Sequence, residues 1–290
     1  MTRTRVLAAL VMAPLAIAAI LLLPTPWLAV LAALVLLVGL WEWLKLAGID
    51  ETLPRTVLTG LNLLLMVLLV WASRDDAGLN PALFQSITLV GAAAWLLAPL
   101  WLWRPGFTAG HQPLARAFKL AAGTLAVVPA WSAMCLLHSG HFAAMPGLAE
   151  AGDASGPRWL LAALALVWAA DSGAYFSGRR FGKRKLAPTI SPNKTVEGAI
   201  GGLAAGVAVA VPLGLWAGAT AAQLPALALV AVLAVAASIV GDLVESLLKR
   251  QAGVKDSGQL IPGHGGILDR VDGVLAALPV FVIGKEILGF

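Results

Sequence analysis

The chain is dominated by nine long apolar stretches that are separated by short polar breaks. They are residues 6–23, 27–44, 57–72, 82–103, 119–137, 158–178, 198–218, 224–247 and 271–288. A helix needs roughly 20 apolar residues to cross the hydrocarbon core of a bilayer. Only 12% of the residues are charged, against about a quarter in soluble domains. We therefore predict an all-α, polytopic integral membrane protein with about nine transmembrane helices and no soluble domain.

Prolines mark several breaks between these stretches, because a proline cannot continue a hydrogen-bonded helix. They are Pro24, Pro26, Pro81, Pro105 and Pro225. The first stretch has a basic start, like a signal peptide, but it is longer than a signal core and a second apolar stretch follows directly. We predict that it is an uncleaved first transmembrane helix. A single cysteine, Cys135, excludes an intramolecular disulfide framework and a cysteine-based zinc cluster.

Lysine and arginine are distributed unevenly among the breaks, and this predicts the orientation in the membrane. With the N-terminus in the cytoplasm, seventeen of the 20 basic residues fall in cytoplasmic segments. The segments on the opposite side of the membrane contain only three basic residues, Arg74, Arg158 and Lys285. This distribution predicts nine spans with a cytoplasmic N-terminus. It also predicts that both long polar segments face the cytoplasm, near residues 179–195 and 249–270.

Carboxylates within or beside the apolar stretches are the strongest chemical signal. Asp171 follows an apolar run, and Asp242 and Glu245 are spaced i, i+3, so they share one helix face with Lys249. A charge at the centre of a span costs about 2.5–3.5 kcal/mol on insertion scales, so such groups usually face an ion, a partner or a polar cavity. The alternative is a carboxylate at a helix end that reaches the interface or pairs with a basic side chain.

A second acidic pair, Asp269 and Asp272, precedes or begins the ninth stretch, again at i, i+3. Negative residues also suit a helix N-terminus, which is a purely structural alternative. Because one loop joins the two helices, Asp242 and Asp269 are expected to converge. Mg²⁺ prefers one or two carboxylates together with phosphate oxygens and water. We predict a magnesium site on Asp242 and Asp269, with Glu245 and Asp272 as further candidate ligands.

The two polar segments contain groups that bind phosphate. Residues 262–266, with His264 among glycines, permit a tight turn that presents backbone N–H groups to an anion, although a flexible turn explains them equally well. In the segment 171–198, small polar groups surround Lys194, namely Ser191, Asn193 and Thr195. Ser191 or Asn193 could instead cap the next helix. That helix begins with Gly198, Gly202 and Gly206 on one face, which predicts close helix packing.

The segment 246–272, SLLKRQAGVKDSGQLIPGHGGILDRVD, resembles the C-terminal signature of phosphatidate cytidylyltransferases, also called CDP-diacylglycerol synthases. Its S-x-x-K-R, K-D, P-x-H-G-G and D-R-x-D elements occur in the family's order and spacing. The segment 171–198 is similar to the family's other patterned region. The first 160 residues match only as a set of hydrophobic helices. We thus expect N-terminal transmembrane helices at 1–157 and a catalytic membrane region at 158–290.

The resemblance implies transfer of cytidylyl from CTP to phosphatidic acid, with Mg²⁺, in the inner membrane of the cell. It implies Asp242 and Asp269 as metal ligands and places Lys249 at a polar position of the signature, to which we assign a catalytic role from its chemistry. The substrate-binding candidates are Asp171, Ser191, Asn193, Lys194, Thr195, Arg250, Lys255, His264 and Arg270. The expected partners are CTP, inner-leaflet phosphatidic acid and the membrane itself, with no nucleic acid and with a homodimer left open. An ion-coupled transporter, a CTP-dependent lipid kinase and a silent lipid-binding homologue are the competing interpretations.

Overall fold

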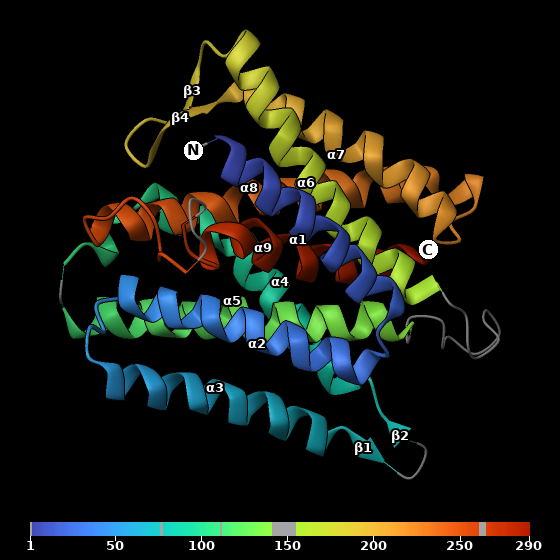
Figure 1. Cartoon of the computed structure of the whole chain (residues 1–290), viewed down its shortest axis with the longest axis horizontal. Helices are drawn as coiled ribbons and strands as arrows, with labels where there is room; N and C mark the ends of the chain where they lie inside the picture. The colour runs from blue at the N-terminus through green and yellow to red at the C-terminus, as the bar shows by residue number, and fades with distance from the viewer. Residues whose placement is uncertain (1, 76–77, 111, 141–154, 261–264) are drawn as a thin grey trace.

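The computed structural model describes residues 2–75, 78–110, 112–140, 155–260 and 265–290. Within these residues the chain forms nine α-helices, two short helical turns and two small hairpins (Figure 1). The helices are α1 (Thr2–Leu22), α2 (Thr25–Leu46), α3 (Thr52–Ala72), α4 (Ala82–Trp103), α5 (Pro113–Ser139), α6 (Ser155–Phe181), α7 (Val196–Trp216), α8 (Leu224–Gln251) and α9 (Leu268–Leu288). The turns are η1 (Pro105–Thr108) and η3 (Ala221–Gln223), and the strands are β1 (Arg74–Asp75), β2 (Gly78–Leu79), β3 (Lys185–Ala187) and β4 (Ser191–Thr195).

The helices confirm the predicted fold class, an all-α polytopic membrane protein. Seven helical segments of the described chain, α2 to α8, are long and apolar enough to cross a membrane. In α1 only Met12–Leu22 counts as an apolar helix, and residues 271–288 of α9 include Asp272, Lys285 and Glu286. The count of nine spans, the cytoplasmic N-terminus and the division at residue 157 stay predictions.

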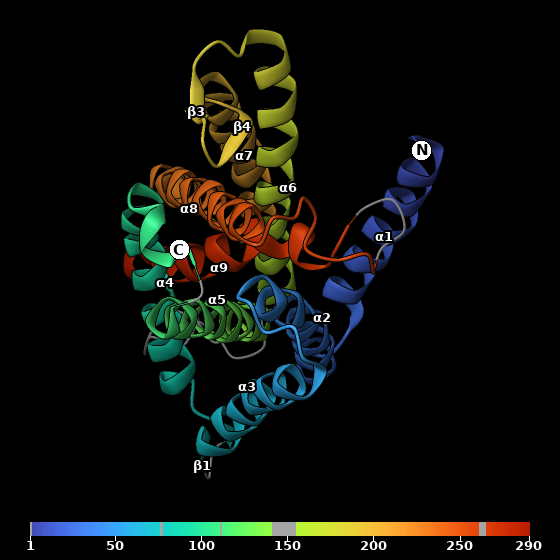
Figure 2. The ribbon, with the colours of Figure 1, turned by 90° about the vertical axis from the view of Figure 1, so that its left-hand side faces the viewer.

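Helix α9 tolerates its charges because other helices surround it. It packs against α8, and also against α2, α4, α5 and α6. Leu268, Leu275, Leu278 and Val282 are fully or almost fully buried along its length. In Figure 2 this helix lies in the middle of the assembly, between α8 and α5. A helix shielded in this way does not need the apolar surface that a lipid-facing helix needs.

Helices α6 and α7 form a close pair that projects from the rest of the molecule, with the β3–β4 hairpin at its tip (Figure 2). The predicted packing role of Gly198, Gly202 and Gly206 is confirmed, since all three are buried. A Cβ at Gly202 would lie 2.9 Å from the carbonyl oxygen of Ala170 on α6. Only glycine allows the two backbones to approach so closely.

The polar segment between α6 and α7 is more ordered than the loop that the sequence analysis expected. Helix α6 continues through Asp171 to Phe181, and the antiparallel β3–β4 hairpin follows. Glu197 on α7 fixes the residues that lead into β3, because its carboxylate accepts hydrogen bonds from the backbone N–H groups of Lys183 and Arg184 (3.0 and 3.1 Å). The expectation that Ser191 or Asn193 caps α7 is wrong.

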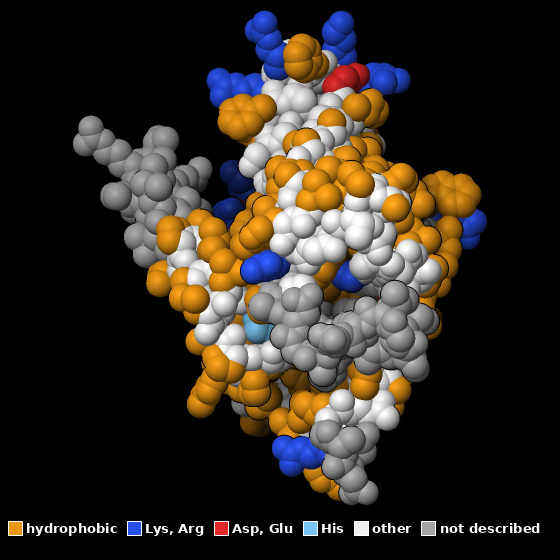
Figure 3. Space-filling model, turned by 90° about the vertical axis from the view of Figure 1, so that its right-hand side faces the viewer, with side chains coloured by type: hydrophobic (Ala, Val, Ile, Leu, Met, Phe, Trp, Pro, Cys, Tyr) orange, Lys and Arg blue, Asp and Glu red, His pale blue; other side chains and the backbone are white. Residues whose placement is uncertain are grey.

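The cap of α7 is Thr195, whose hydroxyl accepts a hydrogen bond from Gly198 N at 3.1 Å. Ser191 and Asn193 lie too early, because β4 runs extended to residue 195. Figure 3 shows basic side chains gathered at the projecting tip, above a broad apolar surface. The exposed basic residues of this part of the chain are Arg179, Arg180, Lys183, Arg184 and Lys185.

Candidate active site

Three carboxylates meet where α8 packs against α9. One oxygen from each of Asp242, Glu245 and Asp272 lies within 4.8 Å of the others. Asp242 and Glu245 share a face of α8, as their i, i+3 spacing predicts. Gly241 lets the helices approach, because a Cβ there would lie 2.5 Å from the carbonyl oxygen of Asp272. The site therefore concentrates negative charge between two helices of the membrane region.

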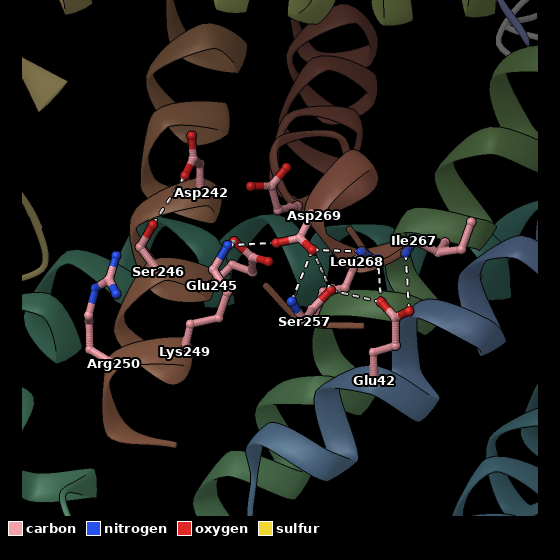
Figure 4. Close-up of polar contacts among 12 residues, drawn as sticks. Glu42, Asp242, Glu245, Ser246, Lys249, Arg250, Ser257, Ile267, Leu268 and Asp269 are labelled. Atoms are coloured by element: carbon pink, nitrogen blue, oxygen red, sulfur yellow. Dashed lines mark hydrogen bonds and ion pairs between the residues drawn. The ribbon is translucent and has the colours of Figure 1, made fainter. Parts of the chain in front are cut away.

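Lys249 joins this cluster to Asp269. Its ammonium lies 2.6 Å from a Glu245 oxygen and 2.7 Å from Oδ1 of Asp269 (Figure 4). The predicted placement of Lys249 on the face of Glu245 is thus confirmed. Burial of a cation between two carboxylates is stable only while all three remain, since removal of one leaves a buried charge without its partner.

Glu245 is the most enclosed of the carboxylates, with only 1% of its surface exposed. Its Oε2 contacts Lys249, but its buried Oε1 has no hydrogen-bond partner among the described residues. A buried carboxylate oxygen without a donor is unfavourable. A divalent cation held with Asp242 and Asp272 would satisfy it, so the oxygen-rich donor set fits Mg²⁺.

Asp269 occupies a different position from the one expected for a direct partner of Asp242. Its Oδ2 accepts hydrogen bonds from Ser257 N (2.9 Å), Ser257 Oγ (2.9 Å) and Gly266 N (2.8 Å). Its other oxygen accepts from Lys249. Asp269 therefore holds the loop between α8 and α9 to the start of α9, and the carboxylate grouped with Asp242 is that of Asp272. Metal binding by Asp269 stays a prediction.

A cavity of about 570 Å³ opens beside Asp242, between the α6–α7 pair and α8. It is lined by all five candidates from the upstream segment, Asp171, Ser191, Asn193, Lys194 and Thr195. Lys194 forms an ion pair with Asp242 across this cavity. The hairpin thus brings residues that are about 50 positions apart in sequence into one polar site.

The remaining candidates are spread around this centre. Arg250 is exposed, and its Nε lies 3.4 Å from the carbonyl oxygen of Ile190 at the hairpin. Arg270 is also exposed, in the first turn of α9. Lys255 lines a second cavity, together with other residues of the loop that follows α8. His264 lies outside the described residues, and its predicted role stays a prediction.

Glu42 on α2 is a polar residue of this site that the sequence analysis missed. Only 7% of its surface is exposed, and its carboxylate accepts hydrogen bonds from Ser257 Oγ (2.8 Å), Ile267 N (3.2 Å) and Leu268 N (2.8 Å). Figure 4 shows it beneath the start of α9, next to the Asp269 network. It is a lone carboxylate in an apolar run, which is the same signal that singled out Asp171.

Two further residues of the cavity were also missed. Tyr175 and Arg179 line it from α6, one turn apart, and the guanidinium of Arg179 donates a 3.3 Å hydrogen bond to the hydroxyl of Tyr175. Arg179 had been grouped with the basic residues that set membrane orientation. Its position on the cavity wall follows from the extension of α6 beyond residue 178, which the apolar pattern alone does not show.

Comparisons with known proteins agree with this geometry. The chain is 40% identical to a phosphatidate cytidylyltransferase of Pseudomonas aeruginosa, over 97% of this chain and 96% of the relative. It is 36% identical to a phosphatidate cytidylyltransferase of Haemophilus influenzae, over 97% of each chain. A Bacillus subtilis relative with the same description is 47% identical over 44% of this chain and 47% of its own length.

The model of the cytidylyltransferase family matches residues 3–288, which is nearly the whole chain. The match includes the α8–α9 carboxylates, the hairpin cavity and the α2 helix that carries Glu42. From this match and from the two full-length relatives, the chain belongs to the cytidylyltransferase family.

Proposed function

We propose that this protein transfers the cytidylyl group of CTP to phosphatidic acid, which gives CDP-diacylglycerol and pyrophosphate. The relatives of nearly full length are described by this activity. The observation that carries the proposal is the cavity in which Lys194 meets Asp242, directly beside Glu245 and Asp272. Basic and acidic groups facing one cavity are what a transfer between two phosphate-bearing substrates needs.

The reaction forms one P–O bond and breaks another. A phosphate oxygen of phosphatidic acid attacks the α-phosphorus of CTP, and pyrophosphate leaves with the electrons of the broken bond. The attacking phosphate is already an anion near neutral pH, so the site does not have to supply a general base. Its tasks are to bring two anions together and to stabilise the charge of the leaving group.

The chain's own residues divide these tasks. Lys194 lines the cavity beside Asp242, where its ammonium can hold a phosphate oxygen, and Arg179 lines the same cavity. Asn193 and Ser191 offer neutral hydrogen-bonding groups along β4. Lys249 lies between Glu245 and Asp269, so we assign it to the positioning of these carboxylates rather than to substrate contact.

We propose Mg²⁺ as the cofactor, held by Asp242, Glu245 and Asp272. Asp269 is linked to this group by Lys249, which contacts both Asp269 and Glu245. The unpartnered Oε1 of Glu245 supports this assignment. When bound, the ion supplies positive charge that neutralises phosphate oxygens of the substrates.

We also propose the inner membrane of the cell as the location, with CTP entering from the cytosol and phosphatidic acid from the inner leaflet. The distribution of lysine and arginine supports this orientation. A homodimer is the assembly state to test, by mass measurement of the purified protein in lipid nanodiscs.

The test is an assay with purified protein, phosphatidic acid, Mg²⁺ and CTP labelled in the cytosine. Label that enters the lipid phase indicates cytidylyl transfer. In a parallel assay with CTP labelled in the terminal phosphate, label in the lipid phase would indicate a lipid kinase and would contradict the proposal. Absence of any labelled lipid from a folded preparation would contradict it as well.

A further inference from the structure

A second polar cavity, of about 830 Å³, lies where α2 ends, α5 begins and the loop after α8 turns back. Four basic residues line it, namely Lys45, Arg116, Lys119 and Lys255, together with two acidic residues, Asp50 and Asp256. Three of the four basic residues come from the N-terminal helices. The cavity therefore carries an excess of positive charge, and it is separate from the cavity that contains Lys194.

Lys119 is the informative residue in this cavity, because only 6% of its surface is exposed. Helix α2 contacts the backbone of Lys119, since the indole N–H of Trp43 donates a 2.8 Å hydrogen bond to the Lys119 carbonyl oxygen. Gly123, one turn later, admits the Trp43 ring, which a Cβ there would approach to 2.8 Å. The backbone of Lys119 is thus fixed against α2, and its side chain lines the cavity.

No carboxylate among the described residues forms an ion pair with Lys119. Neither Lys119 nor Lys45, Arg116 or Lys255 forms an ion pair with any residue that the structure describes. Arg116 lies close to Lys119 and opposes its charge. Burial of a cation beside a like charge is strongly unfavourable unless an anion joins them.

Membrane orientation alone does not explain this arrangement. The rule that basic residues gather on the cytoplasmic side requires charge in the loops, and exposed residues supply it. Arg180 and Lys183 at the projecting tip are of that kind, since both are exposed. Lys119 is enclosed and faces a cavity, which points to a bound partner.

We propose that this second cavity binds a phosphate-bearing anion, held by Lys119 and Arg116 with Lys45 and Lys255 at its opening. Ammonium and guanidinium groups together suit several oxygens of one anion. The ligand is either a polyphosphate from water or the headgroup of an anionic lipid. Ser257 lines the same cavity and also donates to Asp269 and Glu42, so the bound anion contacts the loop that holds the acidic centre.

The experiment uses the full-length protein in phosphatidylcholine nanodiscs, with EDTA present so that binding does not depend on a divalent metal. One probe is radiolabelled inorganic pyrophosphate, measured by equilibrium dialysis. The other is phosphatidylglycerol added to the nanodiscs, counted on the protein by native mass spectrometry. The test variant is Arg116→Gln with Lys119→Gln, and the control, with the same loss of charge, is Arg180→Gln with Lys183→Gln.

We expect the wild type and the control to bind at least one probe, and the test variant to bind it about tenfold more weakly or worse. Loss of pyrophosphate binding identifies a water-borne polyphosphate, and loss of phosphatidylglycerol identifies a lipid headgroup. Lys194→Gln removes a phosphate contact from the other cavity only, so the test substitutions should still weaken binding about tenfold when they are made in the Lys194→Gln protein. Lys45→Gln provides a second test that does not endanger folding, because Lys45 is exposed, and it should weaken binding severalfold.

Equal binding of both probes by the wild type, Lys45→Gln and the test variant would overturn the proposal. So would failure of the wild type to bind either probe, or an equal loss in the control variant. The result is independent of the cytidylyl-transfer assay, because no turnover is measured. An active protein without this binding site would refute only the present inference.

Discussion

Replacement of Glu42 by glutamine is expected to loosen the start of α9. The Oε2 atom of Glu42 accepts hydrogen bonds from Ser257 Oγ and Leu268 N, both at 2.8 Å, and Oε1 accepts from Ile267 N at 3.2 Å. Glutamine has nearly the same shape but carries an amide NH₂ in place of one oxygen. At least one of the N–H or O–H groups that now donate to Glu42 then faces the NH₂ group of glutamine, which is also a donor. The other hydrogen bonds are made to a neutral acceptor in place of a charged one.

The size of the effect follows from these contacts. A hydrogen bond to a charged group contributes about 1.5–3 kcal/mol, against about 1 kcal/mol for a neutral pair. The loss of one such bond and the weakening of two others amount to about 3 kcal/mol. Since 1.4 kcal/mol corresponds to a factor of ten, local opening should become on the order of 100-fold more frequent.

Hydrogen–deuterium exchange measures this opening at the affected groups. The amides of Ile267 and Leu268 should exchange on the order of 100-fold faster in Glu42→Gln, and cytidylyl transfer should fall at least tenfold, because Ser257 also holds Asp269. Glu51→Gln is the matched control, since Glu51 is exposed and makes no side-chain cap bond. Exchange within threefold of the wild type, with full turnover, would refute the role assigned to Glu42.

Four other outcomes are expected. Asp242→Asn should reduce cytidylyl transfer at least 100-fold in a folded protein, which activity and circular dichroism together will show. Lys249→Met should destabilise the fold by about 3–5 kcal/mol, seen as a lower midpoint of thermal unfolding, because the two carboxylates that Lys249 joins are left buried without their cation. Gly202→Leu should destabilise the fold by about 1–3 kcal/mol or more, because it overpacks the contact between α6 and α7. Gly60→Leu should not destabilise the fold, because a Cβ at Gly60 meets nothing within 4 Å. Removal of divalent ions with EDTA should abolish transfer, and Mg²⁺ should restore it; full activity in EDTA would contradict the assigned cofactor.

The position of the helices could be predicted because it depends on local chemistry. Apolar length determines where a span can form. Pro81 and Pro105 flank α4, although Pro99 lies within it, so a proline alone does not define a helix end. The stretch 82–103 coincides with α4, and most other bounds differ by a few residues. Helical periodicity also predicted that Lys249 lies beside Glu245, since four residues make about one turn.

Contacts between distant helices could not be predicted in the same way. A period of 3.6 residues indicates which side chains share a face, but it does not indicate which helix covers that face. Asp269 and Asp272 share a face by spacing, yet rotation and depth of α9 against α8 bring Asp272 to Asp242 and leave Asp269 with Ser257. The sequence analysis had chosen Asp269 because one loop joins the two helices and because of the family resemblance, and neither of these gives the rotation of α9.

By itself, the sequence determined the class of protein, the position of its helices and the residues that are too polar for lipid. These properties follow from the free energy of each segment in a bilayer, which depends on that segment alone. The tertiary structure decided which of these polar residues meet. It placed Glu42 under α9 and enclosed Lys119 in a second cavity, because helix packing joins groups that are far apart in the chain.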